Sequence, residues 1–182
     1  MALYEFEGKR PTISREAFVH PEAVLIGDVV IGARCYIGAG TVMRGDTGTI
    51  VIGDGSNIQD GCVLHTEPGT RAVIGQDCLI GHCVMLHGPL EMGDRVMVGM
   101  SATVLAGCEL GEGCAVAAGS LVKQNARVAA GKMMMGLPAK EVGEITENAA
   151  IFTDLGVKLY QDLAARSLAS MKRIENPAEC MI

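Results

Sequence analysis

Three histidines in the middle of the chain are the side chains best suited to bind a metal: His65, His82 and His87. Imidazole nitrogens are common ligands of zinc, and a site with three of them leaves a fourth position open, which is the catalytic form of a zinc site. Fe2+ or Co2+ can occupy the same kind of site. The sequence therefore predicts a divalent metal centre, provided that the fold brings the three side chains together.

A six-residue repeat is the element that must position these histidines. Its leading residues are all aliphatic, and the step between them is interrupted only after Thr47-Gly48 and after Pro68-Gly69, where we expect loops. Such a fixed period indicates a repeat architecture. The leading residues are Val19, Leu25, Ile31, Ile37, Met43, Ile52, Ile58, Leu64, Ile74, Ile80, Leu86, Met92, Val98, Val104, Leu110 and Val116.

A second, mostly small residue lies four positions after each leading aliphatic, and it forms a second inward column. Five of the seven Cys fall in this column. Free Cys behaves as a small buried hydrophobe. We therefore expect these Cys to be reduced core residues rather than metal ligands.

A period of six with two inward positions resembles the hexapeptide-repeat family, whose fold is a left-handed parallel β-helix. Three hexads form one triangular coil there, and coils stack about 4.8 Å apart. The left hand comes from the resemblance alone, because ordinary parallel crossovers are right-handed. The predicted fold class is an all-β solenoid of about five coils over residues 10–140.

A C-terminal helix is predicted over residues 146–173, because apolar residues there recur at helical spacing. We expect it to pack on the solenoid with its apolar face buried. The residues of this face are Ile151, Leu155, Leu159, Leu163 and Leu168.

Counting hexads around the coil places the polar residues on particular faces. Arg44, His65 and His87 occupy the same slot of successive coils, so they stack in one column. His82 falls on another face, stacked above Asp60. Five extended residues span roughly 16 Å, so His82 does not reach a metal held by the other two histidines of its own chain.

Packing of three solenoids resolves this separation. If the face of His65 and His87 meets the face of His82 in a neighbour, the three histidines converge and Arg44 meets Asp60. A cyclic trimer closes such contacts without leaving open ends. The sequence therefore predicts a homotrimer with the metal at each subunit interface.

Composition argues against some other classes of protein. The formal net charge is −6 and basic residues are not clustered, which is unlike a nucleic-acid-binding protein. No uncharged apolar run approaches the length of about 18 residues that spans a membrane, and no targeting segment is evident. We expect a cytoplasmic protein that binds neither nucleic acid nor membrane.

Several motifs resemble the γ-class carbonic anhydrases: RGD at residues 44–46, NIQDG at residues 57–61, His65, and IGHCVMLHG at residues 80–88. FVHPEAVLIGDV at residues 18–29 and LVKQNA at residues 121–126 are similar to the branch named for phenylacetic-acid degradation and carnitine metabolism.

The resemblance implies roles for individual residues. It implies that two histidines of one subunit and the middle one of its neighbour hold the metal, and that Arg44 and Asp60 bridge the subunits. It also implies that Gln59 hydrogen-bonds the metal-bound water, with Asn57 and Asp46 orienting the surrounding network.

The activity implied is the reversible hydration of carbon dioxide to bicarbonate, since zinc lowers the pKa of bound water to about 7. The chain departs from the family prototype at Thr47, where the prototype has a Glu. Glu67 is the nearest carboxylate in the following loop, and it is either a substitute proton shuttle or a solvated loop residue.

Other functions remain open. The segment Met135–Lys140 resembles the end of coenzyme-A-binding hexapeptide acyltransferases, which use a histidine base. The branch resemblance implies a metal-dependent thioesterase acting on an acyl-CoA of a phenylacetate or carnitine pathway. A non-catalytic scaffold subunit is a third alternative.

Overall fold

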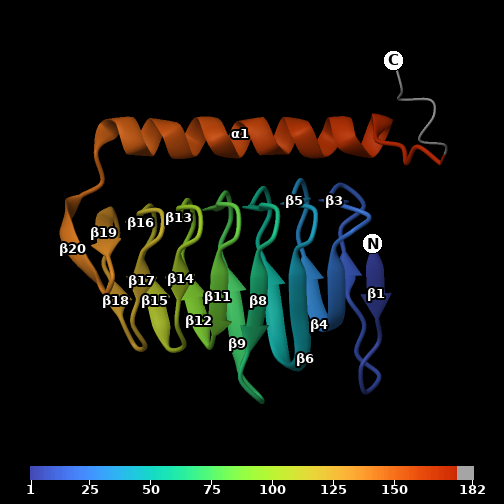
Figure 1. The fold of residues 1–182 in the computed structure, drawn as a ribbon, viewed down its shortest axis with the longest axis horizontal. Helices are drawn as coiled ribbons and strands as arrows, with labels where there is room; N and C mark the ends of the chain where they lie inside the picture. The colour runs from blue at the N-terminus through green and yellow to red at the C-terminus, as the bar shows by residue number, and fades with distance from the viewer. Residues whose placement is uncertain (176–182) are drawn as a thin grey trace.

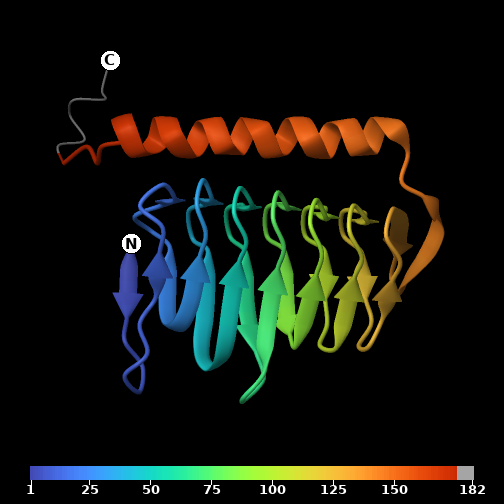
Figure 2. The same ribbon diagram turned by 180° about the vertical axis from the view of Figure 1, so that it is seen from behind.

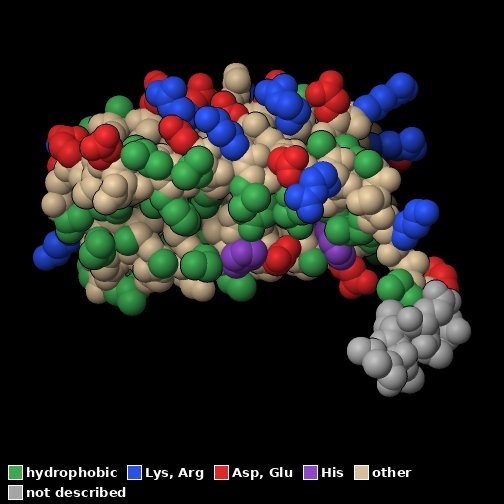
Figure 3. Space-filling model, turned by 90° about the horizontal axis from the view of Figure 1, so that it is seen from above, with side chains coloured by type: hydrophobic (Ala, Val, Ile, Leu, Met, Phe, Trp, Pro, Cys, Tyr) green, Lys and Arg blue, Asp and Glu red, His purple; other side chains and the backbone are tan. Residues whose placement is uncertain are grey.

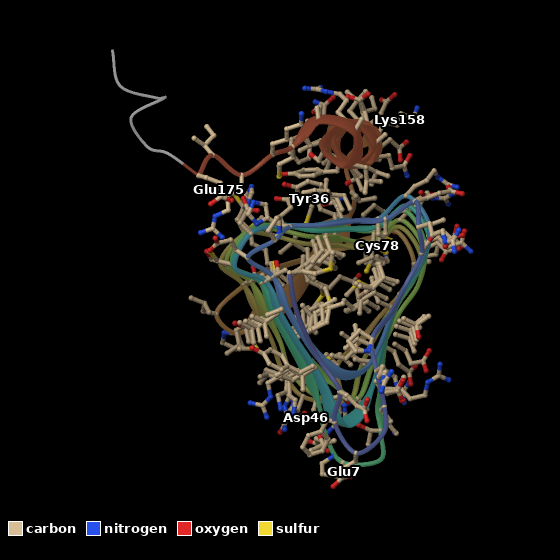
Figure 4. All side chains as sticks on the ribbon, turned by 90° about the vertical axis from the view of Figure 1, so that its right-hand side faces the viewer. Glu7, Tyr36, Asp46, Cys78, Lys158 and Glu175 are labelled. Carbon is tan, nitrogen blue, oxygen red and sulfur yellow. The ribbon has the colours of Figure 1, made fainter. Side chains whose placement is uncertain are left out.

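The computed structural model describes residues 1–175 and is a parallel β-solenoid of about seven turns with one long helix along its side (Figure 1). This confirms the predicted fold class of hexapeptide-repeat β-helix followed by a C-terminal helix. Seen along its axis, the solenoid is triangular, and Cys78 points into the middle of the triangle (Figure 4).

One side of the triangle is an eight-stranded sheet, in the order β20-β19-β16-β13-β10-β7-β5-β3. Its strands pair in parallel, except that β19 and β20 at one end of the sheet are antiparallel. The bounds are β3 Phe18–Val19, β5 Tyr36–Ile37, β7 Asn57–Ile58, β10 Leu79–Ile80, β13 Met97–Val98, β16 Ala115–Val116, β19 Lys132–Gly136 and β20 Ala139–Glu144.

The other two sides form one twelve-stranded sheet, because two long strands run around the corner between them. Those strands are β4 (Val24–Ile31) and β6 (Val42–Ile52). The others are β1 Ala2–Tyr4, β2 Thr12–Ile13, β8 Val63–Thr66, β9 Arg71–Ile74, β11 Met85–Gly88, β12 Leu90–Met92, β14 Thr103–Val104, β15 Cys108–Leu110, β17 Leu121–Val122 and β18 Arg127–Val128.

The core is built from the two inward columns of the repeat. The leading aliphatics and the small residues that follow them form one cluster that runs through the whole solenoid. The column continues past the predicted repeat in both directions, through Ile13 at one end and Val122, Val128 and Met134 at the other. The prediction of about five coils is therefore wrong, because the repeat was counted only from Val19 to Val116.

The first of the two predicted loops is instead part of a strand. Thr49, Ile50 and Val51 lie inside β6, where they pair with β9 on one side, and Ile50 and Val51 also pair with β4 on the other. Their backbone groups are satisfied by these ladders, so the extra residues lengthen the strand. The second excursion, residues 70–73, is mostly strand as well: Arg71–Val73 lie in β9, and only Thr70 belongs to the turn at residues 67–70.

Helix α1 (Glu147–Ser170) begins at the cap residue Thr146, whose side chain accepts a hydrogen bond from the Ala149 amide at 3.2 Å. Strand β20 carries the chain from the last coil to the start of α1, which then runs back along the solenoid (Figure 2). The helix packs on β3, β5, β7 and β10, so it covers the eight-stranded side. No helix within residues 1–175 is long and apolar enough to cross a membrane.

The face that α1 buries is not the predicted one. Its buried residues are small or polar, and they include Thr153 and Ala164, because the sheet beneath presents the large side chains of Phe18 and Tyr36. Of the predicted apolar face, only Leu163 packs against this cluster. The others are about half or more exposed: Ile151, Leu155, Leu159 and Leu168.

Candidate metal centre

His65 and His87 lie side by side on neighbouring strands. His65 in β8 pairs directly with His87 in β11 and, on its other side, with Arg44 in β6, as the repeat predicted. The centroids of the two imidazole rings are 5.6 Å apart, and the rings are inclined at 75°. Two nitrogen donors at this separation can approach one ion at the usual Zn–N distance of about 2.0–2.1 Å.

Polar groups of β6 surround the Nε2 atom of His65. Asp46 Oδ1 lies 3.2 Å from this nitrogen, Thr47 Oγ1 lies 3.3 Å away and Arg44 Nη2 lies 3.5 Å away. Arg44 also donates from Nε to Asp46 Oδ2 at 3.2 Å. The side chain that replaces the prototype Glu, Thr47, is therefore in direct contact with a predicted ligand.

Asp46 is ionised in this setting. Burial raises the pKa of its carboxyl, but the charge of Arg44, a backbone hydrogen bond and His65 together outweigh burial, so the pKa lies below its ordinary value. An ionised carboxylate beside an imidazole fixes the orientation and tautomer of the ring. Asp46 thus contacts His65 directly, and its role in orienting the network around a metal-bound water stays a prediction.

His82 lies in a different part of the coil, in the turn that follows β10. Its Nδ1 atom is 3.4 Å from Asp60 Oδ2, which agrees with the predicted stacking on Asp60. Its Nε2 atom is 3.5 Å from the hydroxyl of Tyr160 in α1. Burial raises the pKa of Tyr160 and the charge of Asp60 raises it further, so this hydroxyl stays protonated and can donate.

Gln59 and Asn57 belong to the same side as His82. Both are buried, Gln59 Nε2 donates to Asn57 Oδ1 at 3.0 Å, and Asn57 Nδ2 donates to the carbonyl of Cys78 at 3.2 Å. These hydrogen bonds fix the Gln59 amide near the turn of His82. Gln59 and His82 line the same groove.

The three histidines do not converge within one chain. Among residues 1–175, no group of three or more metal-binding side chains is close enough to hold an ion. Asp46, the contact of His65, lies at the corner of the triangle farthest from α1 (Figure 4), whereas His82 contacts α1 through Tyr160. The predicted ligands of one chain thus lie at two different corners of the triangle.

This arrangement corrects the predicted docking of one flat face on another. Helix α1 covers the middle of the side that carries His82, so a neighbour cannot lie flat there. The stacked turns at the edge remain available, and they contain His82 and Asp60, whose side chains are 41% and 51% exposed. Arg44, predicted to bridge to Asp60 of a neighbour, contacts Asp46 in its own chain.

Two further predictions concern single residues. Glu67 is exposed in the turn after β8, where its carbonyl accepts a hydrogen bond from Thr70, and its role as a shuttle stays a prediction. The Cys of the inward column are buried free thiols as predicted, and burial raises the pKa of Cys35, Cys62 and Cys78 to about 12. Thiols with such a pKa are poor metal ligands.

Tyr160 is the site residue that the sequence analysis missed. It belongs to the helix, and its contact with His82 depends on where α1 lies along the solenoid, which helical spacing does not give. The feature of the sequence that could have indicated Tyr160 is its position next to Leu159 in the apolar pattern of the helix.

Family models match three stretches of the chain. The model "Bacterial transferase hexapeptide (six repeats)" matches residues 10–45 and 89–124, and the model "Hexapeptide repeat of succinyl-transferase" matches residues 28–65. Neither of these two models describes the γ-class carbonic anhydrases, so the resemblance to that class stays a prediction.

Among curated proteins, the carnitine operon protein CaiE of Escherichia coli K12 is 42% identical over 171 residues, which cover 94% of this chain and 87% of CaiE. CaiE of Salmonella agona is 41% identical over 91% of this chain and 83% of its own length.

Solved structures agree with the fold. A hexapeptide transferase family protein from Anaplasma phagocytophilum is 36% identical with a TM-score of 0.84, covering 90% of this chain and 96% of its own. The Bacillus cereus BC4754 product, provisionally named an acetyltransferase, is 31% identical with a TM-score of 0.87, covering 92% and 97%. The chain therefore belongs to the hexapeptide-repeat family, in the group that contains the carnitine operon proteins CaiE.

Proposed function

We propose that this protein is a metal-dependent enzyme in which histidines of two subunits hold one divalent ion and activate water toward a carbonyl carbon. The observation that carries the proposal is the division of the donors: His65 and His87 are adjacent at one corner, and His82 is exposed beside Asp60 at another. A neighbouring subunit can bring the two halves together, and three histidines fit zinc in its catalytic form.

The residues around the histidines suit this role. A zinc ion bound there would lower the pKa of water to about 7 and so supply a nucleophile at neutral pH. Asp46 orients His65, and Asp60 lies against the Nδ1 atom of His82. Carboxylates in such positions strengthen histidine ligands. Gln59, held by Asn57, offers an amide to the substrate or to water.

An acyl thioester, such as an acyl-CoA of a carnitine-type pathway, is the substrate that the relatives favour. The CaiE proteins are named for a carnitine operon, and the matched models are named for transferases. Carbon dioxide is the other substrate of the same chemistry, and the RGD and NIQDG motifs with the buried Gln59–Asn57 pair favour it. Direct assay of both substrates with one preparation separates them.

Acyl transfer without a metal is the second candidate function. The contact of His82 with Asp60 favours it, because a carboxylate-oriented imidazole is suited to act as a general base. Metal removal discriminates between the candidates. Stripping the metal with a chelator abolishes activity if the metal centre is correct, and leaves it intact if His82 acts as a base.

Mixed trimers test the division of the site between subunits. His65→Ala and His82→Ala each remove one half of every site, so each variant alone is expected to be inactive. When the two are unfolded together and refolded as an equal mixture, about a quarter of the interfaces regain both intact halves. Activity and bound zinc should therefore return to about a quarter of the wild-type values.

The same experiment has a clear contrary result. If all three histidines served a site within one chain, no mixture could restore it, and the mixture would stay inactive. A matched mixture of His65→Ala with His87→Ala is the control, since both substitutions fall on the same half and complementation is not expected.

A further inference from the structure

A groove with a volume of about 620 Å³ runs between α1 and the edge of the eight-stranded sheet. Its floor is formed partly by Gly81 and Gly99, which have no side chains to fill it, and α1 supplies the outer wall. Several apolar side chains on its rim are exposed, among them Phe152 at 63% and Met100 at 55%. Figure 3 shows hydrophobic side chains gathered between the helix and histidine side chains near the edge.

The two ends of the groove differ in chemistry. At one end lie Gln59, His82 and Tyr160, the last two with their polar atoms 3.5 Å apart. The other end is lined by apolar residues from later coils and from the first turns of α1, including Ala118 and Phe152. Polar groups are thus concentrated where the groove meets the proposed metal centre.

The position of α1 along the solenoid sets this polarity. Gly156 lies over Leu79 of β10, and the ring of Tyr160 packs against that of Tyr36 of β5 with centroids 5.1 Å apart and a tilt of 56°. The helix therefore passes from the coil of Ala118 toward the coil of Tyr36 as its sequence advances. From β7 to β16 there are three strand spacings, so the groove extends about 14 Å along the solenoid.

We propose that this groove binds the apolar acyl chain of a thioester substrate, with the carbonyl at the end of Tyr160 and His82 and the chain extending toward Ala118. The proposal rests on the proposed function, in that the polar end adjoins a predicted metal ligand. The wall carries no Lys, Arg, Asp or Glu, so it complements an uncharged, apolar chain. A cavity with apolar walls and a few convergent polar groups is typical of small-molecule sites.

Binding is measured on metal-free protein, so that the result does not depend on turnover. The probes are octanoyl-N-acetylcysteamine and acetyl-N-acetylcysteamine, two thioesters that differ only in the length of the acyl chain. Methyl signals of 13C-labelled methionine report the position of binding. The octanoyl probe is expected to shift Met97 and Met100, which line the groove, and to leave the core residue Met43 unchanged.

Substitutions in the groove give the matched comparison. Ala118→Trp fills the apolar end and is expected to weaken octanoyl binding by at least about tenfold, which corresponds to about 1.4 kcal/mol. Ala130→Trp places the same side chain at an exposed position away from the groove and should leave the affinity unchanged. Tyr160→Phe keeps the ring on Tyr36 but removes the hydroxyl, so it should weaken the probe by about three- to tenfold.

Three results would overturn the proposal. The first is an octanoyl probe that fails to shift Met97 and Met100, and the second is unchanged affinity in Ala118→Trp with native circular dichroism. The third is a methionine shift that follows dilution of the protein instead of addition of the probe, because a second copy of the chain would then occupy the groove.

Failure of the proposed function gives a different result. If metal-free protein binds the octanoyl probe in the groove but the metal-loaded protein hydrolyses neither thioester, the acyl-chain site is supported and the metal-dependent reaction is rejected. If the metal-loaded protein hydrolyses both thioesters at the same rate, and Ala118→Trp has no effect, the metal-dependent reaction is supported and the acyl-chain site in the groove is rejected.

Discussion

At the scale of single residues, the carboxylate of Asp46 contacts both the guanidinium of Arg44 and the imidazole of His65. It accepts a hydrogen bond from Arg44 and lies 3.2 Å from His65 Nε2. The pKa of Asp46 is lowered because the charge of Arg44 and its hydrogen bonds outweigh the effect of burial. Asp46 therefore contacts a predicted ligand without being one.

Asp46→Asn tests whether this contact positions His65. The amide keeps the shape of the side chain but loses the charge, so His65 loses its orienting partner. Removal of such a partner typically lowers metal affinity by about 10- to 100-fold. Zinc affinity measured by competition with a chromophoric chelator is expected to fall by this factor. Asp162→Asn, at an exposed site on α1, is the control, and an equal affinity in both variants would contradict the assignment.

The buried thiols give a second prediction at this scale. Alkylation requires the thiolate, and burial raises the pKa of Cys35, Cys78 and Cys114 to about 12, so almost none is ionised at pH 8. Peptide mapping after iodoacetamide treatment of native protein should leave these three unmodified, and treatment in denaturant should modify them all. Labelling in the native protein would show that the core column is open to solvent.

At the scale of elements, α1 uses its small side chains for packing. Ala164 is fully buried against Phe18 and Tyr36, while Leu155 and Leu159 are each 61% exposed. Large residues of the sheet fit against small residues of the helix, so the two surfaces are complementary in shape. The leucines are left to form the wall of the groove.

Ala164→Leu is expected to destabilise the protein. The added atoms have no space between α1 and the sheet, and overpacking of this kind costs about 1–3 kcal/mol. Urea unfolding should show this loss, whereas Ala169→Leu at an exposed helix position should unfold like the wild type. Equal stability of the two variants would mean that α1 is not held by this contact.

The sequence predicts these elements unequally, for physical reasons. The resemblance to the hexapeptide-repeat family supplies the coil of three hexads. With that coil given, aliphatic residues such as Ile58 and Ile80 at a period of six fix the register, so the stacking of His65 on His87 follows from counting. The helix follows from spacing too, but spacing identifies an apolar stripe and not the surface that it meets. The exposure of Leu155 and the contact of Tyr160 with His82 depend on that surface, so neither was predicted.

At the scale of the whole molecule, the proposed metal site requires an assembly of chains. The histidines lie at two corners of one triangular solenoid, and the edge that carries His82 and Asp60 is left open beside α1. A cyclic trimer is the closed arrangement that we expect. Its native mass should be three times that of one chain.

Asp60→Ala tests the assembly, because this carboxylate is predicted to meet Arg44 of a neighbour. The substitution should shift native mass spectra from trimer toward monomer. Asp60 also accepts a hydrogen bond from the Ala39 amide at 2.8 Å, so loss of the turn must be separated from loss of the interface.

Asp54→Ala supplies the control for that experiment, since Asp54 accepts from the Ala33 amide at the same distance of 2.8 Å. This variant loses the equivalent turn contact on another corner. It is expected to remain a trimer, and dissociation of both variants alike would remove the evidence for Asp60 at the interface.

The repeat also bears on how such chains can change in length. From the coil of His87 to the C-terminal end of the solenoid, successive coils are regular sets of three hexads, so that Met85 pairs with Thr103 and Thr103 with Leu121. A whole coil could therefore be gained or lost near that end without moving the histidines relative to each other. Variation in length within this lineage should come in modules of one coil, and the irregular coils in the middle should be the ones that evolution leaves intact.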